Sequence, residues 1–190
     1  FRKGKNLYFR RYNGGNANTD QFFACFEEVS GRRLTAFKRQ WLYTIGYPEV
    51  TATHRYDRAR RRLTLTLAQR YARARPGREF FHVPVELAAV DARGRDLRGT
   101  RQVVELTGRS KRVVFENVPE PAFLSLNRDC SFYGVFRDAS ATAEELRRQV
   151  RLDPNRFNRV EAMRQLTDRE RLALIRDPAA PVSGEWLELY

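Results

Sequence analysis

Histidine and cysteine are scarce in this chain: two of each occur among 190 residues. Cys25 and Cys130 lie far apart, one in a helical segment and the other in a strand-like segment, so a disulfide framework is not expected. We interpret both as reduced thiols with ordinary packing in a cytoplasmic protein. His54 and His82 begin no His-Glu-x-x-His or Cys-x-x-Cys spacing, so structural or solvent-exposed roles are predicted for both.

Long apolar runs are also absent. No stretch approaches the roughly 18 consecutive apolar residues of a membrane-spanning helix. The beginning of the chain is polar and aromatic and lacks the apolar centre of a signal peptide. The apolar fraction of 42% still suffices for a buried core. The length fits one domain of average size, or a compact domain with helical pieces on either side.

The usual catalytic motifs are missing as well. The chain has no Gly-x-Ser-x-Gly elbow, no phosphate-binding glycine loop and no zinc knuckle. Glu27-Glu28 and Glu144-Glu145 are adjacent carboxylates whose side chains point in different directions on a helix, so capping or solvation explains them better than acid–base chemistry. We therefore assign no catalytic, cofactor-binding or metal-binding residue.

Arginine is what the chain has in excess. The 36 basic residues, nearly all of them arginine, outnumber the 23 acidic residues and give a net charge of +13. Such a charge is typical of proteins that bind nucleic acid or acidic surfaces. The arginines are spread over exposed positions throughout the sequence, however, and residues 139–190 carry equal numbers of both signs. The distribution favours a compositional bias over a patch built for one ligand.

The run Arg58-Ala59-Arg60-Arg61-Arg62 allows two interpretations. It could bind phosphates, in which case binding would depend steeply on salt. Alternatively, it is a solvated hairpin turn between strands at residues 50–55 and 63–69, where exposed charge discourages edge-to-edge pairing. The second interpretation is favoured.

The first part of the chain is predicted to be helical. Thr19 is expected to cap one helix, which Gly31 ends. The following helix is expected to end at Gly46-Tyr47-Pro48, since Gly46 suits a left-handed cap and Pro48 cannot continue a helix. An earlier helix over residues 1–12 has no cap before it, so we expect it to begin upstream. Large apolar side chains recur at helical spacing: Phe22, Phe23, Phe26, Val29, Leu34, Phe37 and Trp41.

The middle part is predicted to form strands. Leu63, Leu65 and Leu67 alternate with smaller residues, which is the pattern of a strand with one buried face. The segment 91–94 has the composition of a hairpin turn. About seven strands separated by turns favour an antiparallel sandwich over alternating β and α units. The expected strands lie around residues 49–55, 63–69, 83–87, 102–106, 112–118, 123–126 and 131–136.

The last part returns to helix. Thr142-Ala143-Glu144-Glu145 and Thr167-Asp168-Arg169-Glu170 are capping-box sequences, and Asp153-Pro154 places a cap before proline at the first helical position. An apolar pattern begins another helix at residue 184, and we expect the natural chain to continue beyond both ends. The expected short helices cover residues 143–151, 154–166 and 168–176.

Several segments, taken in chain order, match one family. They are Phe1-Arg2-Lys3-Gly4, Leu7-Tyr8-Phe9, Thr19-Asp20-Gln21-Phe22, Phe37-Lys38-Arg39-Gln40-Trp41, Gly46-Tyr47-Pro48-Glu49-Val50, Leu63-Thr64-Leu65-Thr66-Leu67, Phe81-His82-Val83-Pro84-Val85, Val114-Phe115-Glu116-Asn117-Val118 and Asp153-Pro154-Asn155-Arg156-Phe157-Asn158-Arg159. No single motif is decisive, but the collinear set covers almost the whole chain. In this respect the chain resembles the aminopeptidase N-type zinc metallopeptidases of bacteria.

The resemblance implies a division into three domains. In that family a thermolysin-like catalytic domain precedes an immunoglobulin-like sandwich, and a large helical domain follows. Residues 1–47 would be the last helices of the catalytic domain, residues 48–138 the sandwich, and residues 139–190 the start of the helical domain. The family's zinc ligands, substrate-amine motif and catalytic tyrosine would all lie upstream, so none can be placed on this sequence. Val160 and the segment 43–45 depart from the family pattern in ways that concern local packing.

The sequence thus predicts a mainly β fold, an immunoglobulin-like antiparallel sandwich of about seven strands between N-terminal and C-terminal helices. The predicted function is that of a non-catalytic structural fragment of a cytoplasmic zinc aminopeptidase that removes N-terminal amino acids from peptides. Its partners would be the remaining domains of that enzyme, which would hold the zinc and the peptide substrate. The alternative is a stand-alone basic sandwich that binds nucleic acid or another acidic partner; no membrane partner is expected.

Overall fold

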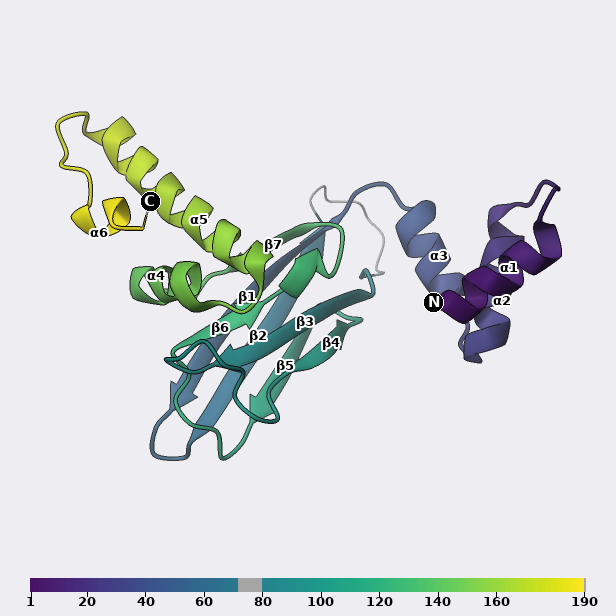
Figure 1. The fold of residues 1–190 in the computed structure, drawn as a ribbon, viewed down its shortest axis with the longest axis horizontal. Helices are drawn as coiled ribbons and strands as arrows, with labels where there is room; N and C mark the ends of the chain where they lie inside the picture. The colour runs from purple at the N-terminus through teal and green to yellow at the C-terminus, as the bar shows by residue number, and fades with distance from the viewer. Residues whose placement is uncertain (72–79, 190) are drawn as a thin grey trace. The chain divides into compact units, whose positions relative to one another are not determined.

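The computed structural model describes residues 1–71 and 80–189. It divides into two compact units, Phe1–Ile45 and Gly46–Tyr190. The first unit is helical, and the second combines strands with further helices (Figure 1). Among the described residues no helix combines the length and apolar character that crossing a bilayer requires.

The first unit consists of three helices: α1 (Arg2–Tyr12), α2 (Thr19–Ser30) and α3 (Thr35–Leu42). Aromatic side chains connect α1 with α2, and the ring centroids of Tyr8 and Phe22 are 5.1 Å apart. Gly4 lies against the ring of Phe26, where a Cβ atom would come within 2.6 Å. The close approach of these two helices therefore requires glycine at position 4.

Two details of this unit differ from the sequence prediction. Asn18, not Thr19, caps α2: its side chain accepts a hydrogen bond from the backbone N–H of Gln21, and the Gln21 side chain accepts one from the N–H of Asn18. A reciprocal pair of this kind satisfies two backbone donors at once. The helix α3 ends at Leu42, so Gly46 lies beyond it with a φ of 111° and does not serve as its cap.

A two-sheet sandwich forms the body of the second unit. One sheet has the strand order β5-β2-β1-β7 and the other β4-β3-β6. All neighbouring strands are antiparallel except β1 and β7, which are parallel. The immunoglobulin-like sandwich predicted from sequence is confirmed, with this one parallel pair. The strands are β1 (Pro48–Asp57), β2 (Arg62–Tyr71), β3 (Val83–Val90), β4 (Gln102–Leu106), β5 (Ser110–Phe115), β6 (Phe123–Leu126) and β7 (Val135–Asp138).

Alternation of side chains along the strands builds the core. Leu63, Leu65 and Leu67 of β2 are fully buried, whereas Thr64 and Thr66 between them lie on the opposite face. Removal of such apolar side chains from water is the main term that stabilises a fold of this size. The other sheet contributes buried residues of β3 and β6: Val83, Val85, Leu87 and Phe123.

The chain after β6 departs from the prediction of a strand over residues 131–136. Only the part from Val135 onward is extended, and a short 3₁₀ turn, η1 (Arg128–Cys130), precedes it. Asn127, Asp129 and Cys130 all have positive φ, which interrupts any strand. Cys130 is therefore exposed in a turn and not packed in a strand, while Cys25 is buried in α2.

Three helices complete the second unit: α4 (Ala143–Leu152), α5 (Arg156–Arg176) and α6 (Gly184–Leu187). The predicted capping box at the start of α4 is confirmed, since the Thr142 hydroxyl accepts a hydrogen bond from the N–H of Glu145 at 3.1 Å. The predicted cap at Asp153 is wrong, because the side chain of Asn155 caps α5 by accepting from the N–H of Asn158.

The predicted helix boundary at Thr167 is also wrong, because α5 continues through it as one helix of 21 residues. Inside the helix, the Thr167 hydroxyl accepts a hydrogen bond from the indole N–H of Trp186 at 3.1 Å. Asp168 pairs with Arg164 one turn earlier at 2.6 Å. Thr167 and Asp168 thus find partners in the middle of a continuous helix, and neither side chain has to cap a new one.

Candidate functional site

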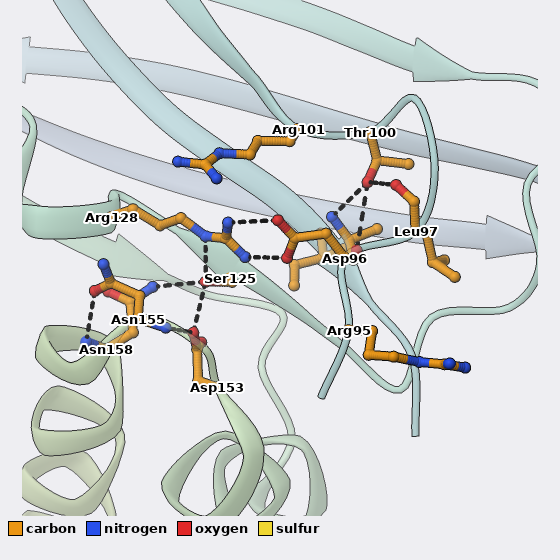
Figure 2. A network of polar contacts seen from close by, with 12 residues as sticks. Arg95, Asp96, Leu97, Thr100, Arg101, Ser125, Arg128, Asp153, Asn155 and Asn158 are labelled. Atoms are coloured by element: carbon orange, nitrogen blue, oxygen red, sulfur yellow. Dashed lines mark hydrogen bonds and ion pairs between the residues drawn. The ribbon is translucent and has the colours of Figure 1, made fainter. Parts of the chain in front are cut away.

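A polar network joins the sandwich to the C-terminal helices (Figure 2). Its members come from three separate stretches of chain: the connection between β3 and β4, the end of β6 with turn η1, and the connection between α4 and α5 together with the first turn of α5. We call it the junction network, and its members are Asp96, Ser125, Arg128, Asp153, Asn155 and Asn158.

Arg128 occupies the centre of the network on the sandwich side, with only 5% of its side chain exposed. Its two terminal nitrogens donate to the two carboxylate oxygens of Asp96 at 2.8 and 2.5 Å. Its Nε donates to the Oγ of Ser125 at 2.8 Å. A two-pronged guanidinium–carboxylate pair of this kind is both strong and geometrically specific.

The helical side supplies Asp153, Asn155 and Asn158. The Oδ1 of Asp153 accepts hydrogen bonds from the Ser125 hydroxyl and from the backbone N–H of Asn155, both at 2.8 Å. The Nδ2 of Asn158 donates to the Oγ of Ser125 at 3.1 Å and to the carbonyl of Leu126 at 3.0 Å. Ser125 therefore donates one hydrogen bond and accepts two, which uses the full capacity of a hydroxyl.

The two carboxylates of the network are perturbed in opposite directions. Hydrogen bonds from Arg128 lower the pKa of Asp96. Burial raises the pKa of Asp153, and its Oδ2 has no hydrogen-bond partner among the described residues. Asp96 and Arg128 thus form a compensated ion pair, while Asp153 acts mainly as an acceptor that connects Ser125 to the helices.

Main-chain contact adds to the network. The loop between β3 and β4 reaches the end of α4 at Gly94, whose φ is 76°. A Cβ atom at this position would lie 2.5 Å from the carbonyl oxygen of Leu152. Only glycine suits both the left-handed backbone and the close approach. The sandwich and α4 are therefore in direct contact at this loop.

A second cluster joins β1, β7 and α4 around His54, whose side chain is 12% exposed. Its Nε2 lies 3.3 Å from the Oε1 of Glu145, and its Nδ1 lies 3.5 Å from the Oδ2 of Asp138. Burial alone would lower the pKa of His54, but the two carboxylates outweigh it and raise the pKa to about 9. His54 is therefore charged at neutral pH and forms ion pairs with both carboxylates, which connects β7 to α4.

This raised pKa predicts a dependence of stability on pH. The charged form is favoured in the folded chain, so His54 contributes fully below its unfolded value near 6.5, and the contribution is lost as the pH rises through about 9. The expected loss is ~2 kcal/mol. Urea denaturation at several pH values measures it, with His54→Gln as the reference. The difference in free energy of unfolding between the unaltered chain and His54→Gln should shrink as the pH rises from about 6.5 to about 9. A difference that stays constant would contradict the assignment.

The Arg58–Arg62 run lies in the hairpin between β1 and β2, as the sequence predicts, with Asp57 paired to Arg62 at the base. Three of its guanidinium groups form ion pairs at 2.9, 3.9 and 2.9 Å. The pairs are Arg58–Glu120, Arg60–Asp57 and Arg62–Glu116. Much of the positive charge of the hairpin is thereby compensated within the sandwich.

Of the adjacent carboxylates, Glu145 acts in capping, as predicted, whereas Glu28 and Glu144 form ion pairs that were not predicted. The side chain of Glu27 accepts a hydrogen bond from the backbone N–H of Leu34 at 2.5 Å, and Glu28 pairs with Arg11 at 2.7 Å. Glu145 takes part both in the α4 capping box and in the His54 cluster. None of these carboxylates faces a second one in the arrangement that acid–base catalysis uses.

Zinc, which the resemblance assigns to the parent enzymes, does not fit the residues that the structure describes. Within residues 1–71 and 80–189 no three His, Cys, Asp or Glu side chains could together hold a metal ion. His54 meets its two carboxylates through opposite ring nitrogens, so the three groups cannot converge on one ion. His82 pairs with Glu105 at 3.3 Å on another strand. No chemical step through a metal follows from these residues.

The junction network is not apparent as a site in the sequence. Its clearest signal is the polar run Asn127-Arg128-Asp129 immediately after the fully buried strand β6. Asp153 was recognised, but as a helix cap. Periodicity identifies elements and their buried faces, whereas the network depends on which three elements meet.

Several known proteins are similar in sequence to this chain. The family profile "Domain of unknown function (DUF3458) Ig-like fold" matches residues 46–139. Aminopeptidase N of Caulobacter vibrioides is 36% identical over 185 residues, which are 95% of this chain and 21% of that protein. Aminopeptidase N of Escherichia coli is 32% identical over 136 residues, which are 65% of this chain and 15% of that protein. The chain thus spans about a fifth or less of the length of these relatives.

The fold is also that of a solved aminopeptidase structure. The structure of Legionella pneumophila aminopeptidase A in complex with aspartic acid matches 98% of this chain and 21% of its own, with a TM-score of 0.81 and 21% sequence identity. This match concerns the fold alone. The profile match and the two aminopeptidase N relatives, taken together, show that the chain carries an aminopeptidase N-type domain, the Ig-like domain of the DUF3458 family.

Proposed function

We propose that this chain is a non-catalytic part of a zinc-dependent aminopeptidase that removes N-terminal amino acids from peptides. In this proposal residues 1–47 belong to a catalytic domain, residues 48–138 are the sandwich, and residues 139–190 begin a helical domain. The sandwich links the other two domains and holds them in a fixed orientation. The parent enzyme is cytoplasmic and binds its zinc and its substrate outside this chain.

The junction network is the observation that supports an orienting role. Its polar groups are largely buried, and buried polar groups are costly unless every partner is in place. An arrangement in which α5 is rotated relative to the sandwich would take Asp153 and Asn158 away from Ser125, and so break the hydrogen bonds that cross from the helices to the sandwich. Such a requirement selects one orientation, which is what a linking domain has to supply.

The proposal is tested on the protein as cells make it. An antibody raised against residues 46–190 is used to purify the endogenous protein, whose intact mass, zinc content and hydrolysis of an alanyl chromogenic substrate are measured. We expect a polypeptide several times larger than 22.3 kDa that contains zinc and cleaves the substrate. The isolated 190-residue chain should cleave nothing, with or without zinc. An endogenous protein of about 22 kDa, or zinc-dependent turnover by the isolated chain, would contradict the proposal.

Nucleic-acid binding through the Arg58–Arg62 hairpin remains the alternative, and no contact of the described residues favours it. Three of the guanidinium groups are already engaged with carboxylates. A phosphate backbone would have to displace these carboxylates or lie beside them, and either lowers the net attraction.

A further inference from the structure

The outer face of the four-stranded sheet carries a polar surface that the core does not use. Thr53 of β1 lies opposite Thr66 of β2, and Arg55 lies opposite Thr64. Arg112 of β5 lies opposite Thr66 on the other side. Residues directly opposite one another share a face, and this face is the one away from the buried leucines of β2. We call these five residues the threonine face.

A shallow depression of ≈ 370 Å³ lies on the threonine face. Its lining includes the threonines together with Arg55 of β1 and Arg112 of β5. The other lining residues are His54, Asp57, Arg60, Arg62 and Val114. The depression therefore offers hydroxyl groups as hydrogen-bond donors and an excess of positive charge.

Its donors are uncommitted. Arg60 and Arg62 have carboxylate partners, but Arg55 and Arg112 are exposed and form no ion pair with any described residue. The hydroxyls of Thr53, Thr64 and Thr66 likewise make no hydrogen bond within residues 1–71 and 80–189. Two free guanidinium groups on either side of three free hydroxyls are complementary to an oxyanion-bearing ligand.

We propose that the threonine face binds an acidic protein segment in an extended conformation. Its carboxylates meet Arg55 and Arg112, and its polar backbone groups meet the threonine hydroxyls. Arg55 lies on β1 and Arg112 on β5, with β2 between them, and their partners on β2, Thr64 and Thr66, are two residues apart. This offset places the Cα atoms of the two arginines roughly 12 Å from each other. Acidic residues four positions apart on an extended chain are separated by roughly 13 Å. The fitting pattern is therefore Glu-x-x-x-Glu.

A protein segment fits this face better than a nucleic acid does. The residues that line the depression include no Phe, Tyr or Trp, and the ring of His54, which is also among them, lies against Asp138 and Glu145. Asp57 lies within the lining, and Glu116 is ion-paired to Arg62 at its edge. A continuous phosphate backbone would meet these negative charges, whereas a segment with two spaced carboxylates avoids them.

Fluorescence anisotropy with a labelled peptide of repeating Glu-Thr-Ser-Thr units, ending in Glu, tests the proposal on the full 190-residue chain. We expect saturable binding that weakens about tenfold in Arg55→Ala/Arg112→Ala. The control is Arg93→Ala/Arg98→Ala, which removes two exposed arginines from the loop between β3 and β4 and changes the net charge equally. It should alter the affinity less than twofold.

A variant with the charges exchanged distinguishes loss of binding from loss of folding, because it should gain binding to a peptide of opposite charge. Arg55→Glu/Arg112→Glu should bind the corresponding peptide with Lys in place of Glu, which the unaltered chain should not bind. Equal losses in the two alanine variants, no saturable binding, or no binding of the Lys peptide by the exchanged variant would overturn the proposal. Tighter binding of single-stranded DNA with the same dependence on Arg55 and Arg112 would also overturn it, in favour of a nucleic-acid surface.

Discussion

Residues 46–190 expressed alone should fold cooperatively, whereas residues 1–45 alone should be largely unfolded in water. The second unit contains the sandwich core, in which Leu63, Leu65 and Leu67 are fully buried. In the first unit only Gly4 and Cys25 are buried, and large side chains such as Phe9 remain half exposed. Helices of this length are marginal without tertiary packing, and a chain of 45 residues seldom buries enough surface to fold.

Circular dichroism and thermal denaturation of the two pieces measure this difference. For residues 46–190 we expect a sigmoidal transition and a free energy of unfolding within about 1 kcal/mol of that of the whole chain. For residues 1–45 we expect weak helical signal and a gradual loss on heating. The 190-residue chain, measured under the same conditions, is the reference for both pieces. A cooperative transition in residues 1–45 would show that the aromatic contacts among α1, α2 and α3 suffice by themselves.

Replacement of Arg128 by alanine should be among the most destabilising single changes in the second unit. It leaves Asp96 with a partly buried charge and Ser125 without one donor, at the point where β6 meets α5. The loss of one partner from a buried ion pair costs about 3–5 kcal/mol. Because Asp96 keeps some exposure, the lower end of that range is expected. Urea denaturation of residues 46–190 or of the whole chain measures the cost.

Arg101 provides a matched control close to the network in Figure 2. It pairs with Glu86 at 2.9 Å, but its side chain is 65% exposed. Arg101→Ala should therefore cost less than about 1 kcal/mol. In a double-mutant cycle, Asp96→Asn should lose most of its effect once Arg128 is replaced. Equal costs for Arg101→Ala and Arg128→Ala would mean that the junction network contributes no more than a surface pair.

The strands were predictable because their patterns are local. Alternating leucines in β2 define both the strand and its buried face, and the boundaries of β6 agree with the prediction because all four of its residues are buried and a turn follows. The α4 capping box is also a local signal, since Thr142 and Glu145 satisfy one another. Each of these features depends on residues fewer than ten positions apart.

The prediction failed where the same local sequence suits two structures. Thr167 has the spacing of a cap, but that spacing also fits the middle of a helix when Trp186 and Arg164 provide partners. The strand expected over residues 131–136 began too early because the turn that starts in η1 continues past it: Ser131 has helical φ and ψ, and the strand starts only at Val135. The junction network was beyond local patterns altogether, since it combines residues from positions 96 to 158.

The helix α5 is a long arm that the junction network holds at its start and that α4 supports through Leu146, Ala162 and Leu166. Its 21 residues extend for about 32 Å, and its first turn lies in the junction network through Asn155 and Asn158. A tilt of about 2° at that end therefore moves the far end by about 1 Å, by simple leverage over the helix length. Hydrogen bonds of 2.8 to 3.1 Å at the base of α5 therefore help to set the direction of the whole helix, together with the apolar contact of Ala162 and Leu166 with Leu146.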